Sequence, residues 1–293
     1  MKDIAEDLHV SVVTVSKVLR NQGYISQETR RRVLKRAKEL NYQPDWVARS
    51  LVTRRTYLIG LVCPDLMYSF FAEVAKGVSR KMRLGGYNVL IAYSEEDLEV
   101  ERQEIEGLLA RRVDGLIIAA AAAQGTRQNR IFKLIEQEKL PYVLIDRQIA
   151  GLKANFVGVS DETVGRLATE HLIGQGCRRL AHIRGPETTT ASGRLKGFRE
   201  ACAAHDIDVP ASWVVAGEFS EEGGYRAMHT LLAGGSPPDG VVCYNDPVAA
   251  GVLKAALEAG IRVPGQIAVI GAGNVHYSDL LRVPLSTIDQ HST

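Results

Sequence analysis

From residue 56 onward, short runs of apolar, mostly β-branched residues alternate with longer segments in which apolar residues recur at helical spacing. The first pattern predicts buried strands and the second predicts amphipathic helices. Because the two alternate roughly every 25–35 residues, the sequence predicts an α/β fold with parallel sheets covered by helices on both faces. The expected strands are Tyr57–Val62, Asn88–Ala92, Gly115–Ala119, Tyr142–Asp146, Phe156–Val159, Leu180–Ile183, Trp213–Gly217, Gly240–Tyr244 and Ile267–Gly271.

The number of these strand–helix units exceeds what a single sheet usually contains, so we expect two doubly wound lobes. We place the first lobe at residues 56–154, with residues 285–293 returning to it, and the second lobe at residues 155–284. In this architecture ligands bind at the carboxyl ends of the strands, so a binding cleft is expected between the lobes.

Residues 1–43 carry helix signals and no strand-like alternation. A first helix containing Ile4 and a tight turn at His9-Val10 precede Ser11, a residue type that caps helices. The run Val12–Leu19 has low helix propensity, so a strand is the alternative there. The preceding helix and the cap favour a second helix.

A helix over this run buries the stripe formed by Val15, Val18 and Leu19. A third, basic helix follows from Ser26 to Leu40. This order is typical of a helix-turn-helix, in which the second helix is free to enter a major groove. The outward face of the second helix holds Val12, Val13, Ser16 and Lys17.

The composition is that of a globular protein, with 45% hydrophobic and 24% charged residues among 293. No apolar run approaches the roughly 20 residues of a membrane helix, and the acidic N-terminus does not resemble a secretory signal. The four cysteines are scattered without a CxxC pair, which predicts reduced thiols and no zinc site. These features favour a cytoplasmic protein.

The net charge of +2 is unevenly distributed along the chain. Residues 1–55 hold 12 Lys and Arg against 6 Asp and Glu, whereas the remaining residues hold 24 against 28. A basic head on a mildly acidic body favours a polyanionic partner for the head alone. A solvated helix face is the alternative, and charge alone does not separate the two.

Several strings in the chain carry a family resemblance. Those of the head are Asp3-Ile4-Ala5, Val10–Asn21 and Val33–Leu51, and those of the body are Arg112–Ile117, Gly185–Phe198 and Asn245–Gly251. Together they resemble the LacI/GalR family of bacterial transcription regulators. The resemblance covers nearly the whole chain and implies a helix-turn-helix head followed by two lobes like those of periplasmic binding proteins.

The resemblance also implies a function. We expect a homodimeric, sequence-specific repressor whose two heads read a pseudo-palindromic operator, with half-sites about one helical turn apart. A small-molecule effector between the lobes is expected to control operator affinity. The alternative is a sugar-binding protein of periplasmic type, which shares this body, but the basic head and the missing signal argue against it. No GxSxG, HExxH, GxxxxGK[ST] or strand–GxGxxG–helix motif is present, so we expect no catalysis, cofactor or metal.

Two features depart from the family pattern. His9 stands where the family usually has glycine, and histidine tolerates a left-handed backbone better than most residues. The chain stops at Thr293, soon after Pro284–Ile288, where the family continues with a further helix and strand. The sequence is therefore expected to be C-terminally shortened and to lack part of the first lobe and of the dimer face.

The resemblance places base contacts at Val12, Val13 and Lys17. Lys17 can donate to guanine O6 and N7, and the valines can contact a thymine methyl group. Packing in the head core is the alternative for the two valines. Contacts to phosphates, which fix the register, are expected from Ser11, Thr14, Ser16 and Asn21.

Residues 44–55 are expected to hold a hinge helix and a linker, because Pro44–Leu51 resembles the family's hinge helix. About two turns of helix are too short to be stable alone, so we expect this segment to fold when two copies pack in a minor groove. Leu51 would wedge between base steps and Ala48 would allow close approach. A plain linker helix is the alternative.

Polar and aromatic residues follow the ends of many predicted strands, and carboxylates, amides and arginine around aromatic rings suit a sugar. Arg194 matches the arginine by which the family commonly holds its effector. Asp161 and Asp246 have the alternative role of helix N-caps, and Phe71 that of a core residue. The candidate ligand-binding residues are Asp65, Phe70, Phe71, Arg147, Asp161, Arg194, Phe219, Asn245, Asp246 and Asn274.

Two further departures bear on the effector. The family usually places an aspartate after the strand that ends at Ile270-Gly271, where this chain has Ala272-Gly273-Asn274. We expect Asn274 to substitute for it. The loop Glu187–Thr190 lacks the arginine of the purine-sensing branch, so a carbohydrate or derivative is expected rather than a purine corepressor.

Overall fold

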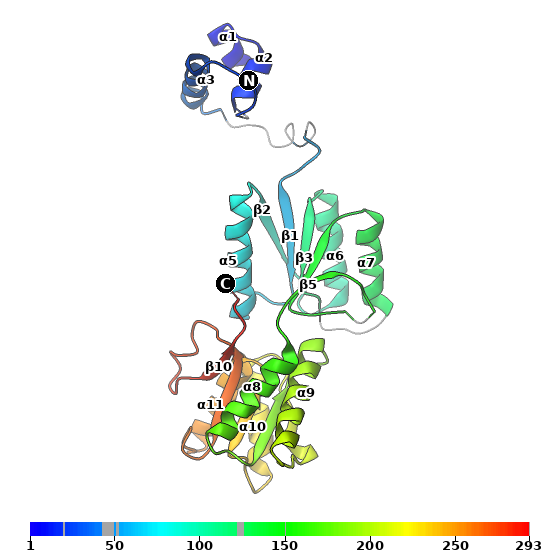
Figure 1. Ribbon diagram of the computed structural model, residues 1–293, viewed down its shortest axis with the longest axis vertical. Helices are drawn as coiled ribbons and strands as arrows, with labels where there is room; N and C mark the ends of the chain where they lie inside the picture. Colours follow the sequence, from blue (N-terminus) through cyan, green and yellow to red (C-terminus); the bar gives the residue numbers. More distant parts are fainter. Residues whose placement is uncertain (20, 43–49, 51–52, 122–125, 150, 293) are drawn as a thin grey trace. The chain divides into compact units, whose positions relative to one another are not determined.

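The chain forms two compact units, which we call the head (Met1–Thr56) and the body (Tyr57–Thr293) (Figure 1). The computed structural model describes residues 1–19, 21–42, 50, 53–121, 126–149 and 151–292.

Three helices build the head, namely α1 (Lys2–Leu8), α2 (Val12–Leu19) and α3 (Gln27–Glu39). His9 ends α1 in a left-handed conformation with a φ of 53°, which gives the tight turn expected from the sequence. The Ser11 hydroxyl accepts the Thr14 N–H at 3.0 Å and so caps α2. The expected helix-turn-helix is therefore present. The core of the head consists of Ile4, Ala5, Val15, Val18, Val33 and Ala37.

The body contains two five-stranded sheets in which all the paired strands run parallel, as expected from the sequence. The first sheet has the order β2-β1-β3-β4-β5, with β1 (Leu58–Cys63), β2 (Asn88–Tyr93), β3 (Gly115–Ile118), β4 (Tyr142–Ile145) and β5 (Asn155–Val157). The second has the order β10-β9-β8-β6-β7, with β6 (Leu180–Arg184), β7 (Val214–Ala216), β8 (Gly240–Cys243), β9 (Ala268–Gly273) and β10 (Ser286–Asp289).

Helices cover both faces of each sheet. Because side chains alternate along a strand, Leu61 of β1 packs with α5, whereas Val62 packs in the cluster that contains α6 and α7. The first sheet carries α5 (Ser69–Leu84), α6 (Leu98–Ala110) and α7 (Thr126–Gln137). The second carries α8 (Asp161–Gly174), α9 (Thr189–Ala204), the 3-10 turn η1 (Ala211–Trp213), α10 (Glu221–Ala233) and α11 (Asp246–Glu258).

Two strands lie in sheets other than those expected. Strand β5 pairs with β4 in the first sheet, with Val157 opposite Ile145, so the first lobe extends past the expected boundary at residue 154. Strand β10 pairs with β9 in the second sheet, so residues 286–289 do not return to the first lobe. Both are short edge strands, whose side-chain pattern does not specify a partner. We define the first lobe as residues 57–157 and the second as residues 161–289.

Candidate functional site

The second helix of the head presents an exposed apolar face. Val12 and Val13 are 40% and 61% exposed, whereas Val15 and Val18 of the same helix are buried. Packing in the head core is therefore not the role of the two valines. Lys17 is exposed in the last turn of this helix, so a cation and apolar groups share the accessible surface.

Polar residues fix the ends of this helix. The Ser11 and Thr14 hydroxyls lie 2.8 Å apart in a hydrogen bond, and Ser16 is half-buried. Asn21 has a left-handed backbone with a φ of 54°, and its Oδ1 accepts a hydrogen bond from Arg30 at the start of α3. These residues hold the helix in place and leave their remaining hydrogen-bonding capacity at the surface. Ala48 and Leu51, predicted in the hinge, lie outside the described residues.

A cleft lies between the two sheets of the body. Its lining segments follow the carboxyl ends of strands β1, β2, β4, β7, β8 and β10, which is where this type of fold binds ligands. The space free of protein atoms amounts to about 700 Å³, part of it open to solvent. The lining residues are Asp65, Met67, Tyr68, Phe70, Phe71, Glu96, Asp146, Arg147, Arg194, Phe219, Ser220, Glu221, Tyr244, Asn245, Pro247 and Gln290.

Seven of the ten predicted ligand residues line this cleft, and three do not. Asp161 pairs with Arg194 and accepts its Nε–H at 3.0 Å. Asp246 is fully buried and accepts hydrogen bonds from the Val275 N–H and from two hydroxyls, those of Ser278 and Thr287. Asn274, expected to replace a missing aspartate, is exposed and is absent from the cleft lining. The structure therefore does not bring these three together with the other seven in the cleft lining.

The alternative role of Asp161 and Asp246 as helix N-caps is not observed either. Ser160 caps α8, one residue before Asp161, and Asn245 caps α11, one residue before Asp246. The Asn245 side chain accepts the Val248 N–H at 2.9 Å and donates to the Phe219 carbonyl at 3.0 Å. Asn245 therefore lines the cleft, but its side chain mainly holds α11 and the Phe219 segment in place.

Arg194 is a buried cation on α9 that two groups hold in place. Its Nη1 donates to the Tyr244 carbonyl at 2.6 Å, its Nε donates to Asp161, and its guanidinium lies 5.0 Å from the centre of the Tyr244 ring. Burial raises the pKa of the Asp161 carboxyl, and Arg194 beside it acts in the opposite direction. The arginine therefore reaches the cleft with its charge already compensated.

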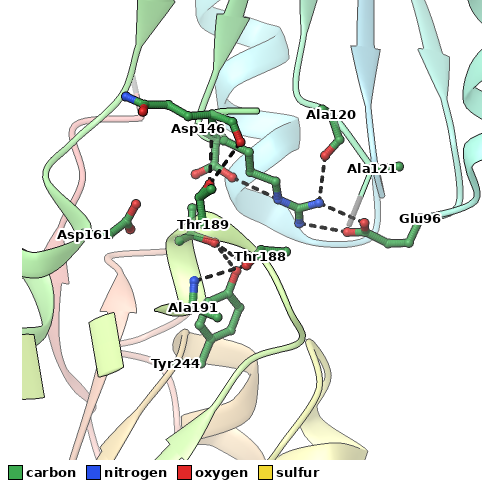
Figure 2. Close-up of polar contacts among 12 residues, drawn as sticks. Glu96, Ala120, Ala121, Asp146, Asp161, Thr188, Thr189, Ala191 and Tyr244 are labelled. Atoms are coloured by element: carbon green, nitrogen blue, oxygen red, sulfur yellow. Dashed lines mark hydrogen bonds and ion pairs between the residues drawn. The ribbon is translucent and has the colours of Figure 1, made fainter. Parts of the chain in front are cut away.

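Arg147 is the second buried cation and belongs to the first lobe, where its partners are Glu96 and Ala120, both labelled in Figure 2. Its Nη1 and Nη2 each donate to a Glu96 carboxylate oxygen at 2.8 Å, and Nη1 also donates to the Ala120 carbonyl at 2.9 Å. The guanidinium lies 5.5 Å from the centre of the Phe219 ring. A bidentate pair of this kind fixes the orientation of the guanidinium plane.

Phe70 and Phe71 are buried and belong mainly to the core. They pack edge to face with ring centres 5.2 Å apart, and Tyr68 lies 5.7 Å from each. Tyr68 is the half-buried member of this group, so it offers the more accessible ring to a ligand.

Comparison with known proteins accounts for both units. Residues 1–45 match the family described as bacterial regulatory proteins, lacI family, and residues 169–293 match a periplasmic binding protein-like domain. The ribose operon repressor of Halalkalibacterium halodurans is 36% identical over 291 residues, which cover 99% of this chain and 85% of that protein. The chain belongs to the lacI family.

Other lacI-family proteins are similar along the same length. The HTH-type transcriptional repressor PurR of Escherichia coli O139:H28 is 36% identical over 294 residues, covering 99% of this chain and 85% of PurR. The crystal structure of the Lac repressor dimer bound to operator and the anti-inducer ONPF has a TM-score of 0.88 at 27% identity, covering 99% of this chain and 87% of that one. The complex of the regulator CelR with cellobiose has a TM-score of 0.72 at 27% identity, with the same coverage of both chains.

This lacI-family chain is therefore a DNA-binding transcriptional repressor controlled by a small-molecule effector. The alternative of a periplasmic-type binding protein without DNA function is not favoured, because the lacI match covers the head. Within the ranges that the structure describes, no helix combines the length and the apolarity needed to cross a membrane.

The cleft of this lacI-family chain also holds residues outside the ten candidates listed from the sequence. Asp146 adopts a left-handed backbone with a φ of 62°, and its carboxylate forms an ion pair with the Arg147 Nε at 3.6 Å. Burial raises the pKa of its carboxyl, and Arg147 acts in the opposite direction. Asp146 directly follows the predicted strand segment Val143–Ile145, so the rule that ligands lie after strand ends points to it together with Arg147. Residues of the cleft that the sequence did not point to include Tyr68, Glu96, Tyr244 and Gln290.

Proposed function

We propose that this repressor is a cytoplasmic homodimer that reads a pseudo-palindromic operator and that its effector is an uncharged carbohydrate held in the body cleft. The proposal includes no catalytic activity, in line with its relatives, which are named as repressors. The Lac repressor dimer on its operator supports the assembly, and the ribose operon repressor and the CelR–cellobiose complex support the effector class.

The charge balance of the cleft is the observation that carries the effector class. Its two guanidinium groups are already neutralised, Arg147 by Glu96 and Arg194 by Asp161. Further carboxylates at Asp65, Asp146 and Glu221 line the same cleft. A phosphate or carboxylate on the effector would find no uncompensated cation and would be repelled.

Hydroxyl groups suit these walls better than charged groups do. Within the described residues, the Asp146 carboxylate accepts no hydrogen bond and pairs with the Arg147 Nε, so its oxygens can accept from effector hydroxyls. The Tyr68 and Phe219 rings offer apolar faces for the C–H side of a sugar. A purine effector is the second candidate, favoured by the 36% identity to PurR but opposed by the absence of an arginine from Glu187–Thr190.

For DNA binding, we propose base contacts by Val12, Val13 and Lys17 and phosphate contacts by Ser11, Thr14, Ser16 and Asn21. The exposure of the two valines and of Lys17 supports this division. A hinge role for Ala48 and Leu51 stays a proposal from the sequence. Selection of bound duplexes from a random pool should recover a pseudo-palindrome, and sedimentation should give a dimer. Recovery of only salt-sensitive background would contradict specific recognition.

Calorimetry with matched compounds tests the effector class. We expect D-ribose or cellobiose to bind and ribose 5-phosphate and hypoxanthine not to bind. Asp146→Asn should weaken binding of the neutral sugar about tenfold, since one charge-assisted hydrogen bond is lost. Asp208→Asn, a change at an exposed position of the second lobe, is the control and should leave the affinity unchanged. Tighter binding of the phosphate ester than of the free sugar would overturn the neutral class.

A further inference from the structure

Three consecutive threonines at the start of α9 face two different parts of the body. Thr188 and Thr190 are buried, their hydroxyls lie 2.7 Å apart, and Thr190 bonds the Tyr244 hydroxyl at 2.9 Å. Thr188 also caps α9 by accepting the Ala191 N–H at 3.1 Å. Because Tyr244 lines the cleft, these two threonines tie the start of the helix to the cleft wall (Figure 2).

Thr189, between them, is exposed and reaches the other lobe. Its Oγ1 accepts the Gln148 N–H at 3.2 Å and donates to the Gln148 carbonyl at 3.3 Å. Gln148 directly follows Asp146 and Arg147, which line the opposite wall of the cleft. The contact therefore joins the two chain segments between which the effector of the proposed function would lie.

A second group of contacts joins the lobes elsewhere, and it is of a different kind. Val275, from the loop after β9, is buried in the apolar cluster that contains Phe71 and Ala75 of α5. Glu73 of the same helix accepts the His276 N–H at 3.3 Å and the Ser292 hydroxyl at 2.6 Å. Separating the lobes there would expose apolar side chains to water.

The Thr189 contact is the easier one to break. Its two hydrogen bonds are near the long limit for such bonds, and both partners are exposed, so water can replace them. A change in the angle between the lobes would therefore separate Thr189 from Gln148 while the α5 contacts persist. We propose that Thr189 is a positioning residue that holds the lobes closed over the cleft, and that effector binding is coupled to operator affinity through this contact. This inference rests on the proposed function for its ligand.

Removing the Thr189 hydroxyl shifts the protein towards an open arrangement of the lobes, and an effector that prefers the closed arrangement then binds more weakly. Thr189→Val removes both hydrogen bonds at nearly constant volume, and Thr189→Ser keeps them. Thr163→Val is the matched control, because the Thr163 hydroxyl donates to Ser160, the N-cap of its own helix, and within the described residues it makes no hydrogen bond to the first lobe.

Energy transfer between dyes on Glu104→Cys of α6 and Ala204→Cys of α9 measures the separation of the lobes in the chain of residues 1–293. The four native cysteines are buried, so the dyes attach to the introduced ones. Without ligand, Thr189→Val should lower the transfer efficiency and Thr189→Ser should not. D-ribose at saturation should restore the efficiency, and its Kd should rise about three- to tenfold in Thr189→Val.

Operator affinity is measured with and without D-ribose. If Thr189 only stabilised the fold, its substitution would not change the effect of D-ribose on operator affinity. Thr189→Val should change the ratio of the two operator Kd values while the melting temperature stays that of Thr163→Val. Equal transfer efficiency in Thr189→Val and Thr163→Val without ligand would overturn the inference. If D-ribose binds to no variant, the proposed effector fails, and the ligand-free transfer efficiency still decides the role of Thr189.

Discussion

Glu101 of α6 is a buried carboxyl that receives little compensation. Its Oε2 accepts the Ala121 N–H at 2.6 Å, whereas its Oε1 has no hydrogen-bond partner in the described part of the chain. Burial raises the pKa of Glu101 to about 7, and the Ala121 N–H and Arg147 oppose this only in part. The group therefore changes its charge near neutral pH in the folded protein.

This shift predicts a pH dependence of stability. In the unfolded chain Glu101 loses its proton near pH 4.5, whereas in the folded protein it keeps the proton up to about pH 7. The free energy of unfolding should therefore fall by roughly 3 kcal/mol from this group as the pH rises from 4 to 8. Glu101→Gln should remove that part of the dependence, measured by denaturant unfolding at several pH values. Glu104→Gln, at an exposed neighbouring position, is the control. Its free energy of unfolding should change with pH as steeply as that of the wild type.

The residue scale also shows where sequence reasoning ends. The rule that ligands lie after strand ends placed Arg147 and Phe219 at the cleft, because the position of a residue along the chain decides that much, whereas Arg194 came from the family resemblance. It could not identify Asp246 as saturated by three donors, since those donors come from residues 275–287, which are distant in sequence. Asp146 is the converse case, a strand-end carboxylate with free acceptor capacity.

At the scale of elements, helices α8 and α9 are in backbone contact. A Cβ on Gly197 would lie 1.9 Å from the Glu162 carbonyl oxygen, and one on Gly165 would lie 2.0 Å from the Arg194 carbonyl oxygen. The contact is closed by backbone atoms, which cannot move aside as a flexible side chain can. The distance between these helices also sets the ion pair of Asp161 on α8 with Arg194 on α9, and Arg194 lines the cleft.

Gly197→Ala should therefore force the two helices apart. We expect a loss of about 1–3 kcal/mol in the free energy of unfolding and weaker effector binding, because Arg194 moves with its helix. Gly174→Ala, at the open end of α8 with no atom within 4 Å of the added Cβ, should be neutral or slightly stabilising. Thermal unfolding and calorimetry on both variants check the difference. A fully folded, sugar-binding Gly197→Ala would contradict the close contact.

In the body, the sequence pattern predicts which segments form strands better than it predicts which strands pair with each other. The runs Gly115–Ala119 and Gly240–Tyr244 contain the mostly buried strands β3 and β8, as their apolar composition predicts. The sheet that β5 and β10 join could not be predicted, because each strand is only three or four residues long and pairs along one edge. Pairing of these strands depends on the path of the connecting loops.

At the scale of the whole molecule, the head and the body are separate compact units with separate cores. The head core holds six buried residues, so it is expected to be only marginally stable. The body has larger apolar clusters in each lobe. Heating should therefore give two unfolding transitions, with the head unfolding first.

Substitution of two valines on helix α2 of the head distinguishes effects on the stability of the head from effects on operator binding. Val15 is fully buried, so Val15→Ala should cost about 2 kcal/mol and lower the first transition alone. Val13 is 61% exposed, so Val13→Ala should leave both transitions in place and weaken only operator binding. Calorimetric melting and operator titration of the two variants distinguish these effects, and sugar binding by the body should be unchanged in both. A single transition that moves as a whole in Val15→Ala would show that the head and the body unfold together.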